Sequence, residues 1–230
     1  MTPSNSNRHG MAVSINTVAI KRSGCMWVRA EDTFMPRYFD VTGDAFEIDH
    51  LTVALSHCFG RGIALDVGAH YGSWTRHLSR QFAQVYAYEP VPETFACLAE
   101  NTRDFPNVQI FQQAVGEMNQ CVSVGRGKLY QHPGTETVTG SSGDIEMVRI
   151  DDLGLPLVDF LKIDVEGYEL HVLRGAEQTL RRDKPVVIFE ENNRGLLEHN
   201  IENGTCASFL NGLGAKQVCV LNKDFVFKWC

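Results

Sequence analysis

The stretch IALDVGAHYGSW, residues Ile63–Trp74, indicates how the chain folds. Its apolar run Ile63–Val67 is typical of a buried strand, and Gly68 and Gly72 then turn the chain into a helix expected over Ser73–Gln81. The glycine spacing is G-x-x-x-G, which differs from the G-x-G-x-x-G of dinucleotide-binding folds. Glycines after a strand let the backbone approach a ligand closely, and a helix N-terminus attracts negative charge. The stretch therefore predicts a strand, a ligand-binding turn and a helix.

Strands and helices alternate downstream of this turn. Further strands are expected at Val85–Tyr88, Val108–Gln112, Leu157–Ile163, Pro185–Phe189, Gln217–Leu221 and Phe225–Trp229, and helices at Glu93–Arg103, Tyr168–Arg181 and near Ala207–Asn211. A stretch rich in Gly, Ser and β-formers, Cys121–Ile150, interrupts the alternation. This order predicts an α/β domain with a mostly parallel, doubly wound sheet.

The chain upstream of Ile63 has a different character. Residues 1–10 are polar and are expected to form a disordered tail. Residues 11–60 are expected to form an N-terminal extension, with β-like runs up to Phe39 and one helix over Phe46–Phe59. Residues 61–230 then make up the α/β domain.

Composition narrows the classes of partner. The 230 residues carry 21 Lys and Arg against 28 Asp and Glu, a net charge of -7, which argues against a general nucleic-acid binder and against binding to an anionic membrane surface. No apolar run approaches the ~20 residues of a membrane helix, and the polar N-terminus lacks the apolar core of a signal peptide. Seven cysteines without a C-x-x-C pair indicate reduced thiols. We therefore expect a soluble, cytoplasmic protein.

Two acidic residues suggest the type of ligand. Glu89 follows the strand Val85–Tyr88, where an acid is placed to accept hydrogen bonds from ribose hydroxyls, although an incidental acid beside an ordinary turn would look the same. Asp66 ends the preceding strand, with no phosphate-binding lysine in its turn. A carboxylate there favours a ligand that is cationic near the turn. S-adenosylmethionine meets this condition through its sulfonium and ammonium groups, whereas the pyrophosphate of NAD would be repelled.

A second block, VDFLKIDVEGYELHVLRGA at Val158–Ala176, brings more carboxylates to the same region. Asp164 ends a strand and Glu166 follows just beyond it, and ligands of open α/β sheets lie outside the carboxyl ends of strands. The simpler alternative is that both acids cap the helix that begins near Tyr168.

The blocks DVGAHYGSW, YAYEP, QAVG, RIDDL and FLKIDVEGYELHVLRGA together resemble the FkbM-type S-adenosylmethionine-dependent methyltransferases, over roughly Leu65 to Asn192. The resemblance implies a class I methyltransferase (Rossmann-like) fold, with a seven-stranded, mostly parallel sheet and helices on both faces. Its strand order would be 3-2-1-4-5-7-6, with strand 7 antiparallel. It also implies O-methylation of a hydroxyl on a sugar, glycan or other small natural-product acceptor.

The resemblance also implies roles for individual residues. It assigns Asp66, Gly68 and Gly72 to the methionine end of the cofactor and Glu89 to the ribose, with Gln113 and Ala114 at the adenine edge. His70 replaces a common Asn, and an imidazole with a pKa of about 6.5 predicts a cofactor affinity that varies with pH. The complete expected cofactor-binding set is Asp66, Gly68, His70, Gly72, Ser73, Trp74, Glu89, Pro90, Gln113 and Ala114.

Transfer to a hydroxyl asks for a general base within ~2.6–3.2 Å of the acceptor oxygen. Asp164 is the first candidate by position and Glu166 the second, and Asp164 could instead hold the methionine amine. His171, about one turn into the following helix, is a poorer candidate. Glu190 also ends a strand and could bind the substrate.

Three alternatives remain open from the sequence. Asp164 with Glu191 and Asn192 could imitate a Mg²⁺ ligand set, but a helix cap and a solvated face explain these residues better, so no metal is predicted. The segment Gly125–Gly143 could be a flexible lid or a plain surface loop. The chain could also be another Rossmann-like enzyme that uses NAD or a nucleotide, or a binding module for S-adenosylmethionine without catalysis.

Overall fold

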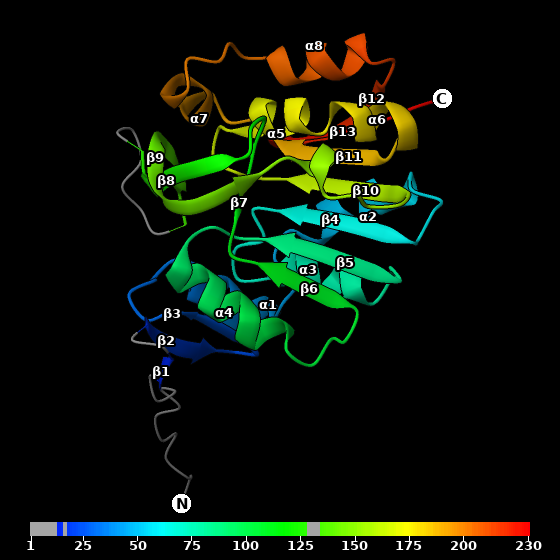
Figure 1. The fold of residues 1–230 in the computed structure, drawn as a ribbon. Helices are drawn as coiled ribbons and strands as arrows, with labels where there is room; N and C mark the ends of the chain where they lie inside the picture. Colours follow the sequence, from blue (N-terminus) through cyan, green and yellow to red (C-terminus); the bar gives the residue numbers. More distant parts are fainter. Residues whose placement is uncertain (1–12, 16–17, 128–133) are drawn as a thin grey trace, which may run out of the picture.

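Seven strands form the central sheet of the computed structural model, which describes residues 13–15, 18–127 and 134–230 (Figure 1). The strand order is β12-β13-β11-β10-β4-β5-β6. In chain order the strands are β4 (Ile63–Val67), β5 (Gln84–Tyr88), β6 (Val108–Phe111), β10 (Val158–Ile163), β11 (Val186–Glu190), β12 (Lys216–Leu221) and β13 (Asp224–Lys228). The expected tail, residues 1–10, lies outside the described residues.

The pairing confirms the expected topology. β4, β5, β6, β10 and β11 pair in parallel, whereas β13 runs antiparallel to both β11 and β12. β4 lies between β5 and β10, so the chain leaves it toward one side of the sheet and returns on the other. Ligands of such sheets bind in the crevice at the carboxyl ends of the strands beside this reversal. All five residues of β4 are buried, as expected for a strand that is covered on both faces.

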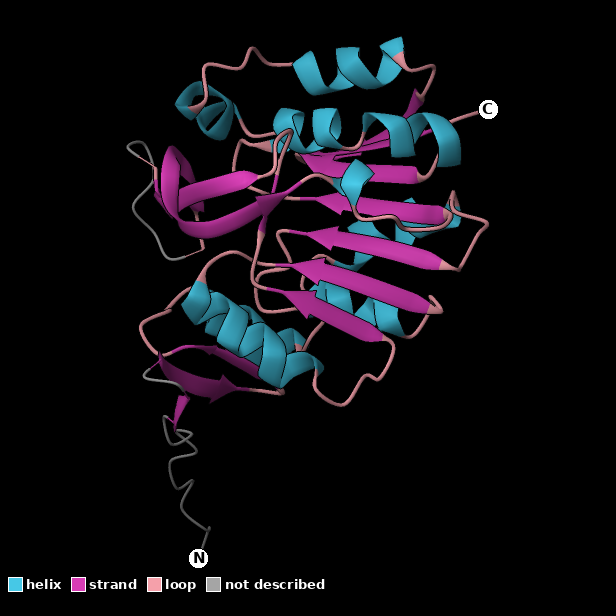
Figure 2. Ribbon diagram, in the orientation of Figure 1, coloured by secondary structure: helices cyan, strands magenta, loops and turns pink. Residues whose placement is uncertain are grey.

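Helices cover both faces of the sheet (Figure 2). On one face α5 (Glu169–Gly175), α6 (Glu177–Asp183) and α8 (Thr205–Gly212) pack their leucines against β4, β10 and β11. On the other face α2 (Ile48–Ser56) and α3 (Ser73–Ser79) pack against the opposite side chains of the same strands. α4 (Pro92–Thr102) follows β5, and the short α7 (Asn193–Glu198) follows β11. The helix expected over Tyr168–Arg181 is in fact two helices, because the chain leaves helical geometry at Ala176.

The N-terminal extension contains a small sheet and two helices. β1 (Val13–Ile15), β2 (Val18–Ser23) and β3 (Met26–Arg29) form an antiparallel sheet, and α1 (Met35–Thr42) follows it. The expectation of β-like runs up to Phe39 was wrong for its last part, TFMPRYF at residues 33–39, because α1 begins there at Met35. Pro36 lies in the first turn of α1, where its missing N–H costs nothing, and Asp32 Oδ1 accepts the backbone N–H groups of Phe34 and Met35. The helix expected over Phe46–Phe59 is the shorter α2.

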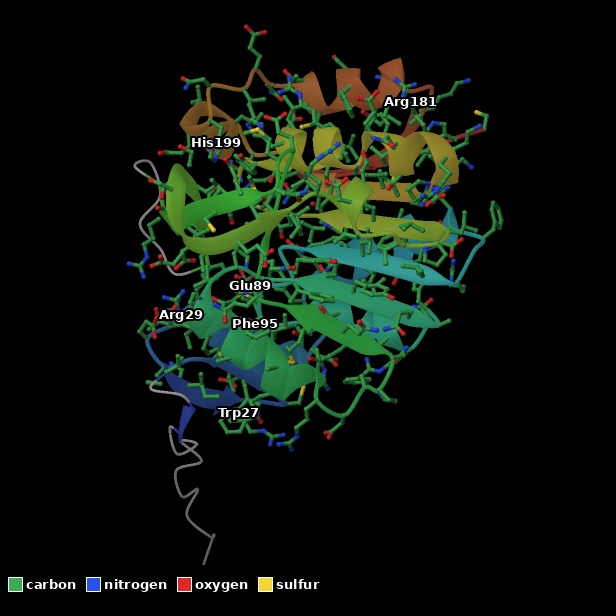
Figure 3. The ribbon with its side chains drawn as sticks, in the orientation of Figure 1. Trp27, Arg29, Glu89, Phe95, Arg181 and His199 are labelled. Carbon is green, nitrogen blue, oxygen red and sulfur yellow. The ribbon has the colours of Figure 1, made fainter. Side chains whose placement is uncertain are left out.

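Specific polar contacts hold the extension against the α/β domain. Asn101 of α4 donates to the backbone carbonyls of Trp27 and Tyr71 and accepts the Trp27 N–H. Tyr71, in the turn after β4, donates its hydroxyl to Asp32 at 2.9 Å. Figure 3 shows Trp27 and Arg29 beneath α4, on the side of the molecule where the extension lies. The extension is therefore fixed directly to the turn after β4.

A second small sheet takes up most of the segment Gly125–Gly143, for which a flexible lid and a plain surface loop were the two alternatives. β8 (Gln120–Arg126) and β9 (Glu136–Val148) pair antiparallel, and β7 (Ala114–Val115) joins β9. Most of Gly125–Gly143 therefore belongs to strands, and residues 128–133 lie outside the described part. The ion pair between Arg29 and Glu136, at 2.7 Å, links this hairpin to the extension.

None of the helices in the described ranges is long and apolar enough to cross a membrane.

Candidate active site

A cavity of about 850 Å³ opens at the carboxyl ends of the parallel strands. Its walls come from the turn after β4, the ends of β5, β10 and β11, and the loop after β6, together with the N-terminal extension and the β8–β9 hairpin. Figure 3 places Glu89 at the sheet edge toward which the arrowheads of the parallel strands point. The sequence blocks around Gly68, Glu89 and Asp164 thus meet at one site.

The turn after β4 is built closely against β10. Gly68 has a φ of +75°, and a Cβ at this position would lie 1.7 Å from the backbone oxygen of Asp164, so only glycine is accommodated. The Gly68 N–H donates to the Tyr88 carbonyl, which ties the turn to the end of β5. Gly72 has a different role: it does not line the cavity, and its missing side chain leaves room for Leu98 of α4.

Glu89 is buried at the end of β5 with its carboxylate held in place. Oε2 accepts the His70 N–H at 2.9 Å and Oε1 accepts the Val91 N–H at 3.0 Å. Burial raises the pKa of Glu89 to about 7, although these two hydrogen bonds oppose the shift. Each oxygen keeps a second lone pair, so the carboxylate can accept two further hydrogen bonds from a ligand.

His70 lines the cavity as expected, but its protonation differs from the expectation. Its ring lies against that of Tyr71, with centroids 3.9 Å apart and the ring planes tilted by 35°, and its Nε2 is buried without a partner among the described residues. Burial lowers the pKa of His70 to about 4. The expected variation of cofactor affinity through His70 near neutral pH is therefore not supported, since the imidazole stays neutral there.

Asp66 does not line the cavity, contrary to its expected contact with the cofactor. Its side chain is fully buried, where Oδ2 accepts the Thr75 hydroxyl at 2.6 Å and Oδ1 pairs with Lys162 Nζ at 3.2 Å. Lys162 does line the cavity; it donates to the Gly68 carbonyl at 2.5 Å and lies 3.8 Å from Asp164. Burial opposes the charge of Lys162, but Asp66 and Asp164 raise its pKa. Asp66 thus influences the cavity indirectly, because it holds Lys162 in place and keeps it protonated.

The remaining expected cofactor residues, Ser73, Trp74, Pro90, Gln113 and Ala114, all line the cavity. Ser73 donates to the Asp44 carbonyl and Trp74 to the Phe46 carbonyl, so both also hold the extension in place. Gln113 donates to Glu146 of β9 at 2.7 Å.

Three carboxylates gather at the other end of the cavity. Asp164, Glu166 and Glu190 bring oxygens within 4.8 Å of one another. Burial and the neighbouring Asp164 raise the pKa of Glu166 to about 8, and the same causes, with Glu166 itself, raise that of Glu190 to about 9. Asp164 has 43% of its side chain accessible, against 22% for Glu190. The cluster therefore holds protons near neutral pH and can exchange them with a ligand.

The alternative Mg²⁺ set is not brought together. Glu191 does not line the cavity and accepts the Gly204 N–H at 2.6 Å, whereas Asn192 caps α7 through the Gly195 N–H. His171 also lies away from the cavity and pairs with Glu117 at 2.8 Å. The acid that joins Asp164 and Glu166 is Glu190.

The family model described as the methyltransferase FkbM domain matches residues 66–200, more than half of the chain. This chain belongs to the FkbM methyltransferase family. The matched range contains the turn after β4, Glu89 and the three carboxylates of the cavity.

Two curated proteins that are similar in sequence to this FkbM chain are named as methyltransferases. Hexuronic acid methyltransferase AglP of Haloferax volcanii is 29% identical over 150 residues, which cover 62% of this chain and 61% of that protein. 2-O-methyltransferase NoeI of Sinorhizobium fredii is 24% identical over 153 residues, which cover 53% of this chain and 60% of that protein. The chain therefore spans about three fifths of the length of these relatives.

Solved structures confirm the fold class. N-methyltransferase NodS from Bradyrhizobium japonicum matches with a TM-score of 0.51 at 11% identity, over 82% of this chain and 96% of that one. SMU.1697c, a putative methyltransferase from Streptococcus mutans in complex with SAH, matches with a TM-score of 0.51 at 15% identity, over 78% and 94%. At these identities the likeness establishes the class I methyltransferase fold alone.

Sequence reasoning missed several residues of this FkbM cavity. Lys162 was not recognised as a site residue, because a single lysine inside the apolar strand VDFLKI is typical of an edge or surface position. Phe34 and Tyr38 of the extension line the cavity although the sequence around them carries no motif. The turn between β12 and β13 adds Lys223, and β13 adds its first residue, Asp224. Their position beside β11 follows only from the sheet order.

We expect the FkbM fold to lose stability as the pH rises from about 6.5 to 9. Burial raises the pKa of Glu89 and Glu169 to about 7, of Glu166 to about 8 and of Glu190 to about 9, all from a reference of 4.5. The folded state therefore binds protons that the unfolded chain has released, so stability is lost as the pH passes through these values. Urea unfolding across this range should show a decrease of at least about 2 kcal/mol.

The control for this expectation is Glu190→Gln, which should flatten the decline at its alkaline end. Burial lowers the pKa of His70 and His199, which acts in the opposite direction but only below about pH 6.5. A stability that is constant or increases between pH 6.5 and 9 would contradict the protonated carboxyl cluster.

Proposed function

We propose that this chain transfers the methyl group of S-adenosylmethionine to a hydroxyl oxygen of a sugar, glycan or other small natural-product acceptor. Membership of the FkbM family supports the reaction class. The printed names of AglP and NoeI, which refer to a hexuronic acid and to 2-O-methylation, support a carbohydrate hydroxyl. The observation that carries the proposal is the cavity itself, where the turn after β4 and Glu89 face a cluster of protonatable carboxylates.

The residues at the β4–β5 end suit S-adenosylmethionine. Glu89 is fixed by two backbone N–H groups and keeps lone pairs for the two ribose hydroxyls. Nε2 of His70, which has no partner in the part of the chain that the structure describes, can accept or donate one further hydrogen bond, according to the tautomer. Lys162 and Asp164 offer one charge of each sign, which matches the carboxylate and ammonium of the methionine end. When bound, S-adenosylmethionine supplies a methyl group already activated on a sulfonium, so the protein needs no covalent intermediate.

The carboxylates at the other end supply the proton acceptor. A hydroxyl must lose its proton as it attacks, and the best base has a pKa close to the working pH. Glu166, whose pKa lies at about 8, meets this condition better than Glu190, whose pKa lies at about 9. Asn192 donates to Glu166 at 3.4 Å, and Glu166 itself has a φ of +55°, so its position is set by the backbone and by α7. We therefore assign proton removal to Glu166, with Asp164 beside it binding the cofactor amine or the acceptor.

Transfer of a labelled methyl group tests the proposal. The protein is incubated with S-adenosylmethionine carrying carbon-13 in its methyl group and with a panel of hexopyranosides, and products are identified by NMR. We expect the label on an oxygen of a sugar ring. Label found on nitrogen or carbon of the accepted compound would contradict O-methylation.

A further inference from the structure

Three aromatic side chains line the cavity in a continuous row. Phe34 and Tyr38 lie one helical turn apart at the start of α1, with ring centroids 5.1 Å apart, and Phe46 follows Tyr38 at 5.3 Å. Phe34 is 57% exposed and Tyr38 41% exposed. Apolar rings that stay open to water inside a cavity mark a surface that a ligand covers.

The aromatic row is fixed to the same turn that would hold the cofactor. Asp32 caps α1 through the backbone of Phe34 and accepts the Tyr71 hydroxyl. At the far end of the row, Trp74 of α3 donates its ring N–H to the Phe46 carbonyl at 3.2 Å. A ring that lies on the row would therefore be held at a set position relative to the turn after β4.

The acidic residues that line the same cavity disfavour a negatively charged ligand. Six acidic residues face its acceptor end and the adjoining extension: Glu47, Asp49, Asp164, Glu166, Glu190 and Asp224. The cations there are already paired, since Lys162 contacts Asp66, Lys223 lies 3.5 Å from Glu190 and His50 lies 2.6 Å from Asp224. No arginine lines the cavity within the described residues. A negatively charged acceptor would thus add a further negative charge beside acids that already raise one another's pKa, and Lys162 is the proposed partner of the cofactor carboxylate.

We propose that Phe34, Tyr38 and Phe46 form the platform on which the ring of the acceptor lies, and that this acceptor is a saccharide without negative charge, with an amino sugar preferred. This rests on the methyl-transfer function proposed above. The C–H face of a pyranose ring is apolar and can cover the aromatic rings, while its hydroxyl groups reach the carboxylates. An ammonium group on the sugar would be stabilised by cation–π attraction to the ring faces and by electrostatic attraction to the surrounding acidic residues.

The test compares three glycosides that differ in one substituent: methyl glucosaminide, methyl glucoside and methyl glucuronide. Each is titrated by ligand-observed NMR into protein saturated with S-adenosylhomocysteine. We expect the glucosaminide to bind tightest and the glucuronide weakest, with about a tenfold difference or more between the two. At pH 8, where Glu47 with its pKa of about 7 is mostly ionised, Glu47→Gln should reduce this ratio because it removes one of the facing charges.

Variants of the platform test the role of the rings. Phe34→Ala and Tyr38→Ala should each raise the Kd of the glucosaminide by ~5–10-fold, with no change in S-adenosylhomocysteine affinity. Two matched controls lie outside the cavity: Val41→Ala on the same helix, 84% exposed, and Phe59→Ala, an aromatic that is 92% exposed. Neither should change the Kd. Thermal unfolding of all four variants checks that the fold is intact.

The outcomes separate the two proposals. If S-adenosylhomocysteine binds but the glucuronide is as tight as the glucosaminide, or the platform variants bind like the controls, this inference is overturned and the methyl-transfer function stands. Failure of all three glycosides to bind also overturns the inference. If the wild-type chain does not bind S-adenosylhomocysteine at all, the proposed function itself is overturned.

Discussion

Replacing Glu166 by glutamine is expected to lower kcat by a factor of ~10²–10⁴, measured with an acceptor that the wild-type chain methylates. The substitution keeps the size of the side chain and its contact with Asn192, but it removes the only basic form that Glu166 can take. S-adenosylhomocysteine affinity should change little, because the substitution leaves the proposed cofactor residues Glu89 and Lys162 and their contacts with the turn after β4 unchanged. The loss should therefore appear in turnover rather than in cofactor binding.

The pH profile distinguishes a base from a residue that only caps α5. In the wild type, kcat should increase with pH up to about 8, where Glu166 loses its proton, and this rise should disappear in Glu166→Gln. Asp164→Asn is the matched variant, since it removes the neighbouring charge that raises the pKa of Glu166. The rise should then move to lower pH. Near-native kcat in both variants would contradict the assignment and direct the search to Glu190, the third acid of the cluster.

Replacing Lys162 by methionine is expected to destabilise the protein by about 3–5 kcal/mol. Lys162 is the cation that faces the fully buried Asp66, and without it one carboxylate oxygen would be left in the core without a counter-charge. The substitution also removes the hydrogen bond to the Gly68 carbonyl, which holds the turn after β4 against β10. Chemical denaturation monitored by circular dichroism gives the free energy of unfolding.

The double variant Lys162→Met with Asp66→Asn supplies the control. An amide at position 66 carries no charge and can still accept the Thr75 hydroxyl, so much of the lost stability should return. If the double variant is as unstable as the sum of the two single variants, the ion pair does not explain the burial of Lys162.

The strands of the central sheet can be predicted from the sequence because they are mostly apolar runs that are followed by glycine or acidic residues. IALDV, QVYAY and VDFLKI each became a parallel strand, and their carboxyl ends placed Gly68, Glu89 and Asp164 together, as expected. Their neighbours in the sheet follow from the family resemblance rather than from local pattern. The hairpin of β8 and β9 was less visible, since glycine and serine favour loops locally and only pairing across strands orders them.

The extension shows where local reasoning fails. Pro36 interrupts a β-like run, but it occupies the first turn of α1, a position where proline is tolerated. The role of Asp66 could not be read for a related reason: its partner Lys162 lies far along the chain and reaches it only because β4 and β10 are neighbours. Likewise the neutral state of His70 arises from burial beneath segments that the local motif does not contain.

The most direct test of the proposed cofactor site is calorimetric titration of the wild-type chain and of Glu89→Ala with S-adenosylhomocysteine and with NAD. We predict that the wild type binds S-adenosylhomocysteine more tightly than NAD, and that Glu89→Ala weakens this binding by ~1.5–3 kcal/mol, the scale of hydrogen bonds to a charged group. Equal affinity in Glu89→Ala, or tighter binding of NAD than of S-adenosylhomocysteine by the wild type, would contradict the S-adenosylmethionine site at this turn.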